Sequence, residues 1–106
     1  MLRVHSVVLE LIRDVAPVAG LISRRDGDLA KQLRSALSSV ALNIAEASDQ
    51  RGARRDSHYS IALGSARESW SALQVAAAWG YIAEPVGLKG RFDEVIGTLV
   101  RVTHPR

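Results

Sequence analysis

The stretch DLAKQLRSALSSVALNIAEAS (residues 28–48) places apolar residues three or four positions apart along its whole length. This spacing matches the 3.6-residue turn of an α-helix and leaves one apolar stripe for a core. The stripe consists of Leu29, Leu33, Ala36, Leu37, Val40, Ile44 and Ala47. Asp26 and Asp28, around Gly27, mark a turn and a helix start, because carboxylates cap free N–H groups and face the positive end of the helix dipole. The stretch is therefore predicted to form an amphipathic helix.

The same periodicity occurs three more times, and no stretch alternates as a β-strand would. Pro17 interrupts the first stripe, so we expect a kinked helix or two shorter helices there. Gly80 is placed to cap the third helix, and Glu84-Pro85 to open the fourth. The expected helices cover residues 3–23, 28–48, 56–79 and 85–102. With short connections between them, they predict an all-α fold, an up-down-up-down antiparallel four-helix bundle.

Length and composition narrow the class of protein. The 106 residues fit one domain, 1–106, and 47% hydrophobic with 24% charged residues is ordinary globular usage. With no cysteine, disulfides, thiolate zinc sites and cysteine nucleophiles are excluded. Charged residues near the N-terminus argue against a secretory signal, and no apolar run approaches the ~20 residues that span a bilayer. We expect a cytoplasmic protein without a membrane partner.

The third expected helix has two apolar faces. One stripe, from Tyr59 to Ala77, suits a bundle core. A nearly opposite face carries Ile61, Ser65, Glu68, Ala72, Val75 and Trp79. Because a four-helix bundle has no central position, a helix that is apolar on two sides indicates contact with another chain. These six residues are therefore the predicted oligomer interface. The alternative is that Trp79 folds over the following loop and the small residues are simply exposed.

Four polar residues on the middle helices, Asn43, Glu46, Ser65 and Glu68, admit two interpretations. Oxygen-bearing groups of this kind can hold a divalent cation or share acid–base chemistry. However, no metal-ligand spacing accompanies them, and the three histidines follow no pattern. The favoured interpretation is structural: these groups form hydrogen bonds at helix or subunit contacts, because a buried carboxylate needs a partner. No catalytic residue, metal or cofactor is predicted.

The connection at residues 48–55 is expected to be a flexible loop that carries Arg51, Arg54 and Arg55. The net charge is +3, and 12 of the 14 basic residues are Arg, which suits planar contacts to phosphate. The loop precedes a helix N-terminus, which attracts anions. Arg24 and Arg25, at the other connection, complete the five predicted nucleic-acid contacts and either enlarge this patch or lie at the opposite end. The alternative is a solvated loop that only aids solubility.

Two blocks carry a family resemblance. QLRSALSSVALNIAEAS (residues 32–48) and HYSIALGSARESWSALQVAAAWGYI (residues 58–82) resemble proteins related to the 23S rRNA intervening-sequence protein. The first block matches the family pattern at Gln32, Arg34, Ala36, Ser39, Asn43, Ile44, Ala45 and Glu46. The second matches at Ile61, Ala62, Gly64, Ser65 and Glu68. Ala47 departs from the pattern, which has Gly there, and the first helix lacks the family's usual aromatic residues.

The resemblance implies a four-helix bundle that assembles into a ring, typically a pentamer. It also links the chain to the accessory protein of diversity-generating retroelements, which works with a reverse transcriptase and nucleic acid. The resulting expectation is a non-enzymatic, ring-forming homo-oligomer that binds RNA or DNA backbone electrostatically, as a scaffold for a partner enzyme. The alternative is a protein-interaction scaffold without nucleic-acid binding.

Overall fold

A computed structural model describes residues 2–104 and contains four α-helices. Their bounds are α1, Leu2–Arg25; α2, Gly27–Ser48; α3, Gly52–Ala78; and α4, Val86–Thr103. Over the described residues there is no β-strand, so the all-α prediction is confirmed. None of the four helices holds an apolar run long enough to cross a lipid bilayer, within that same range. Met1, Pro105 and Arg106, which the expected domain includes, lie outside the described residues.

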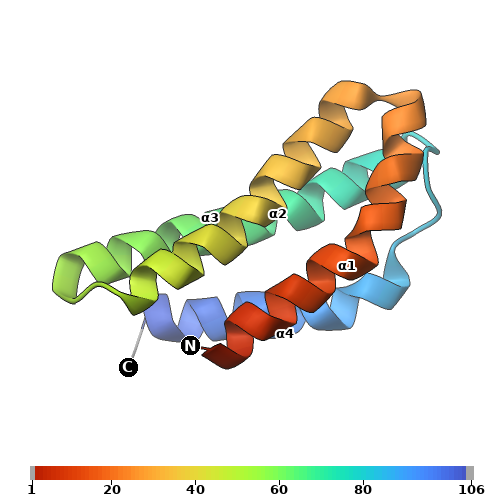
Figure 1. Ribbon diagram of the computed structural model, residues 1–106. Helices are drawn as coiled ribbons and strands as arrows, with labels where there is room; N and C mark the ends of the chain where they lie inside the picture. Colours follow the sequence, from red (N-terminus) through yellow and green to blue (C-terminus); the bar gives the residue numbers. More distant parts are fainter. Residues whose placement is uncertain (1, 105–106) are drawn as a thin grey trace.

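Each helix packs against the next along the chain, and α4 also packs against α1. The contact between α2 and α3 is the most extensive, and the molecule is elongated, at 42 × 22 × 19 Å (Figure 1). The core contains the stripe predicted for α2, with Leu33, Val40 and Ile44 fully buried. From α3 and α4 it receives Tyr59 and Phe92, whose burial removes large apolar surfaces from water.

Pro17 lies inside a continuous α1 rather than between two shorter helices. Its ring removes one backbone hydrogen bond and displaces the preceding turn, which is the usual cause of a bend. Figure 1 shows α1 bending along its length. At the end of this helix, Asp26 caps α2 as predicted, and its carboxylate accepts a 3.0 Å hydrogen bond from the Leu29 N–H.

The prediction of a loop over residues 48–55 is wrong for residues 52–55. Helix α3 begins at Gly52, so Arg54 and Arg55 belong to its first turn, and the connection shrinks to Asp49, Gln50 and Arg51. Gly52 has φ +61°, a left-handed backbone that glycine adopts without steric cost. This single residue turns the chain sharply enough for the helix to start early, and helical periodicity does not reveal such a turn.

Gly80 ends α3 as predicted. It has φ +81°, its N–H bonds to the Ala77 carbonyl, and the Tyr81 N–H bonds to the Ala76 carbonyl. This pair of hydrogen bonds is the Schellman arrangement, which requires a residue in the left-handed conformation just after the helix. The cap therefore sets the direction in which the chain leaves α3 for α4.

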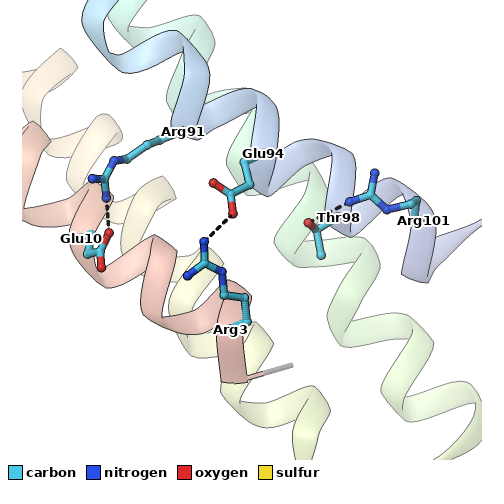
Figure 2. A network of polar contacts seen from close by, with 6 residues as sticks. All are labelled: Arg3, Glu10, Arg91, Glu94, Thr98 and Arg101. Carbon is cyan, nitrogen blue, oxygen red and sulfur yellow. Dashed lines mark hydrogen bonds and ion pairs between the residues drawn. The ribbon is translucent and has the colours of Figure 1, made fainter.

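Ion pairs link the exposed flanks of α1 and α4 (Figure 2). Arg3 lies 3.4 Å from Glu94, and Arg91 contacts both Glu10 and Asp14. These side chains are between 42% and 83% exposed, so each pair contributes about 0–1 kcal/mol. Their effect is to set the register of α4 on α1 rather than to supply most of the stability.

We expect Gly80→Ala to lower the free energy of unfolding by about 1–2 kcal/mol, because an L-residue is strained at positive φ. Gly90→Ala is the matched control. Gly90 is exposed inside α4 with open space around its Cα, so alanine there should stabilise by up to about 1 kcal/mol. Guanidinium chloride unfolding followed by circular dichroism measures both. Equal effects of the two substitutions would contradict the cap assignment.

Candidate functional site

The outer side of α3 carries an exposed apolar stripe. Ile61, Val75 and Trp79 are 48%, 41% and 68% exposed, although large apolar side chains of this kind are usually buried. Glu68 lies between them on the same side of the helix and is also exposed. We call Ile61, Glu68, Val75 and Trp79 the outer stripe. It contains four of the six residues predicted to form an oligomer interface.

The other two residues of that predicted interface are engaged within the chain. Ala72 is buried at 7% exposure, and Ser65 is half-buried at the contact with α2. Gly64, beside the outer stripe, is different: a Cβ added there meets no atom within 4 Å. A glycine at position 64 lowers the stability of α3 by about 1 kcal/mol relative to alanine. Packing inside the chain therefore does not explain why a glycine is there.

Trp79 does contact the chain that follows it, as the alternative interpretation expected, but it remains mostly exposed. Its ring stacks on Tyr81 with centroids 6.4 Å apart and an interplanar angle of 18°. The Arg25 guanidinium lies 5.4 Å from the centre of the Tyr81 ring. The tryptophan is thus held in one place by Tyr81 while one of its faces stays open to solvent.

A polar cluster lies between α2 and α3. Asn43 donates from Nδ2 to the Ser39 carbonyl at 2.9 Å, and its Oδ1 accepts a 2.9 Å hydrogen bond from His58 Nδ1. Ser65 Oγ donates to Ser39 Oγ at 2.9 Å. These bonds satisfy half-buried polar groups on facing helices, so in this chain Asn43 and Ser65 connect α2 to α3.

The two carboxylates of the predicted polar set, Glu46 and Glu68, are exposed and lie apart from this cluster of hydrogen bonds. Over residues 2–104, no three His, Asp or Glu side chains lie close enough together to hold a metal ion. The hydrogen-bonding role expected of these two carboxylates is therefore not fulfilled inside one chain.

The α2–α3 tip, residues 48–55, reaches beyond the ends of α1 and α4 (Figure 1). Arg51 and Arg54 are exposed there, and no side chain caps the N-terminus of α3. Arg55 is held in place: its guanidinium lies 4.8 Å from the centre of the Tyr59 ring and 3.7 Å from the Asp56 carboxylate. The tip therefore offers two exposed cations beside free N–H groups, an arrangement that suits an anion.

Arg24 and Arg25 lie at the opposite end of the molecule from the tip (Figure 1). They occupy the last turn of α1, where cations interact favourably with the negative end of the helix dipole. The sequence left open whether Arg24 and Arg25 enlarge the patch at the tip or lie at the opposite end, and the structure shows the second arrangement. The five predicted phosphate contacts of one chain therefore form two groups, not one patch.

Sequence reasoning missed a groove of about 300 Å³ between α1 and α2. Its walls are Ile12, Val15, Ala16, Ala19, Arg34, Leu37 and Ser38. All but Arg34 and Ser38 are apolar, and Arg34 is exposed at the edge. The sequence feature that could have indicated this groove is the pair Ile12 and Ala19, which makes the apolar stripe of α1 wider than one face of a bundle helix. Whether such a flank is covered depends on how closely α2 approaches, which periodicity does not encode.

We expect Asn43→Ala to lower the free energy of unfolding by about 1–2 kcal/mol, because it leaves half-buried partners without their hydrogen bonds. In a double-mutant cycle with His58→Ala, the coupling energy should reach about 0.5 kcal/mol or more. Ser35→Ala, at an exposed position of α2, is the control and should change stability by less than about 0.5 kcal/mol. Strict additivity of Asn43→Ala and His58→Ala would show that the contact contributes nothing.

This four-helix architecture is similar to that of a known protein. A solved structure of a protein of unknown function from the S23 ribosomal protein family of Bacteroides thetaiotaomicron VPI-5482 is similar, with a TM-score of 0.83 and 20% identity. The match covers 95% of this chain and 98% of that one, and at this identity it shows the fold alone. No curated protein matches. A family model, 23S rRNA-intervening sequence protein, matches residues 2–100. The chain therefore belongs to the 23S rRNA-intervening sequence protein family.

Proposed function

We propose that this protein is a non-enzymatic homo-oligomer, a ring with a pentamer favoured, that binds the backbone of RNA or DNA electrostatically. In this role it serves as a cytoplasmic scaffold for a partner enzyme. The observation that carries the proposal is the projecting α2–α3 tip with exposed Arg51 and Arg54 beside the uncapped start of α3. Each added subunit adds one such tip, and electrostatic affinity rises with every phosphate that is neutralised.

The outer stripe supports the assembly part of the proposal. Three large apolar side chains on one helix face lose contact with water if a second chain covers them. The family resemblance implies the ring and its subunit number. Within each subunit we propose the antiparallel up-down-up-down course. The ion pairs between α1 and α4 support it. Going along α1 from Arg3 to Glu10, the partners go backward along α4 from Glu94 to Arg91, as they do in two antiparallel helices.

The charge of the tip supports a backbone-directed contact rather than reading of bases. Arg54 and Arg51 provide guanidinium groups that fit phosphate oxygens, and the first N–H groups of α3 add donors. The tip's aromatic neighbour, Tyr59, is buried and lies beneath Arg55, so it offers no surface on which a base stacks. Binding through the tip should therefore be independent of sequence and sensitive to salt.

The second candidate function is a protein-interaction scaffold without nucleic-acid binding. Asp56 beside Arg55 favours it, as does Asp49, which shares an open hollow at the tip with Arg51 and Arg55. These carboxylates reduce the positive potential that phosphate meets there. The two candidates differ in one measurable quantity, the affinity for nucleic acid at low salt.

For assembly, we expect sedimentation velocity of the wild type to give a multiple of the 11.5 kDa chain mass. Val75→Ser with Trp79→Ser should shift the mass toward the monomer, because the stripe loses apolar surface. Val86→Ser is the control, since Val86 is 79% exposed at the start of α4 and is not a member of the outer stripe. A monomeric wild type at all concentrations would refute the proposed assembly.

For nucleic-acid binding, we expect mobility-shift titrations to show retention of RNA or DNA at ~50 mM salt and its loss at high salt. Arg51→Ala with Arg54→Ala should reduce the slope of log K against log salt by about two for each engaged tip. Arg24→Ala with Arg25→Ala removes the same charge from the opposite end and serves as the control. Absence of retention at ~50 mM salt would leave the protein-interaction scaffold as the function.

A further inference from the structure

We propose that the outer stripe of one subunit docks into the groove between α1 and α2 of the next, with Glu68 of the first subunit paired to Arg34 of the second. This inference rests on the proposed homo-oligomer and specifies its interface. It makes the contact heterologous: two different surfaces meet, which is the type of contact that builds closed rings.

Charge complementarity selects the two surfaces. Glu68 is the one acidic member of an otherwise apolar stripe, and Arg34 is the one charged residue lining an otherwise largely apolar groove. Over residues 2–104 neither side chain forms an ion pair. When the apolar surfaces meet, the carboxylate and the guanidinium lose water together, so each needs the other as a partner.

The two groups lie on different helices and form no ion pair with each other over residues 2–104. Arg34 lies on the flank of α2 that faces α1, where it lines the groove with Ile12 and Ala16. Helix α3 packs against the other flank of α2, where Asn43 bonds to His58. Arg34 also borders a hollow on the outer side of α2 with Ser39 and Asn43, and over residues 2–104 no ion pair joins it to Glu68. A second copy supplies the partner that each group lacks.

Part of the outer stripe matches the groove in length. Glu68 and Val75 are seven residues apart, which is about 10.5 Å along a helix at 1.5 Å per residue. Ile12 and Ala19, at the two ends of the groove on α1, have the same separation. The Glu68–Val75 part of the stripe and the groove are thus matched over two turns. Leu9, seven residues before Ala16 and 36% exposed, extends the apolar flank of α1 further.

A contact of the outer stripe with itself is less favourable. Glu68 lies near the middle of a stripe that runs from Ile61 to Trp79, so a two-fold contact brings two carboxylates close together in apolar surroundings. Like charges in such a contact oppose association. The groove instead offers the opposite charge at the matching place.

The test is a charge exchange followed by sedimentation velocity of the full chain. We expect Arg34→Glu and Glu68→Arg each to raise the dissociation constant of the assembly about tenfold or more, and the double exchange to restore it. Arg67→Glu is the control: Arg67 adjoins Glu68 but lies off the outer stripe, so assembly should persist. Circular dichroism verifies that every variant keeps its helices.

The outcomes separate this inference from the proposal on which it rests. If the wild type assembles and Arg34→Glu has no effect, the groove is not the docking site, although the homo-oligomer stands. If Glu68→Gln strengthens assembly, the stripe meets itself, because removing the carboxylate relieves repulsion between like charges, and the inference is overturned. If the double exchange fails to rescue two disruptive single variants, the two residues do not face each other, which also overturns it. A monomeric wild type refutes the homo-oligomer itself.

Discussion

A helix in a four-helix bundle can turn only one side toward the core, and α3 is apolar on two. Its inner side buries Tyr59, Leu63, Ala66 and Leu73 against the other helices. Its outer side leaves Ile61, Val75 and Trp79 in contact with water. Because burial of apolar surface is the main favourable term in association, this imbalance is the reason to propose that a second chain covers α3. The proposed ring, and the multiplied arginines at its tips, depend on that contact.

The contact between α2 and α3 fixes where the functional candidates lie. Buried alanines, among them Ala47, Ala62 and Ala66, allow the two helices to approach closely. The hydrogen bonds of Asn43 and Ser65 fix their register. This pairing carries the α2–α3 tip beyond the rest of the molecule and turns the outer stripe away from the core. A stable pair of helices thus supports both surfaces on which the proposed function relies.

Exposed charge has a different role at each place where it occurs. Between α1 and α4 the ion pairs align two helices that are already held by their apolar faces. At the tip, Asp56 draws Arg55 away from an incoming anion and leaves Arg51 and Arg54 available. In the groove and on the outer stripe, Arg34 and Glu68 are unpaired within one chain over residues 2–104. The position of a charge, more than the net value of +3, therefore decides what it can bind.

The sequence by itself determined the four helices, the buried stripe of α2, the Asp26 cap and the Gly80 terminus, because these follow from periodicity and from short-range backbone chemistry. It also identified the second apolar face of α3. It did not determine that α3 begins at Gly52, since one glycine with positive φ turns the chain without changing the periodic pattern. Only the tertiary structure decided that Ala72 and Ser65 are used within the chain, that Arg24 and Arg51 lie at opposite ends, and that Arg34 borders an open groove. Each of these depends on the distance and rotation between helices, which arise from packing over the whole bundle and not from any local stretch of residues.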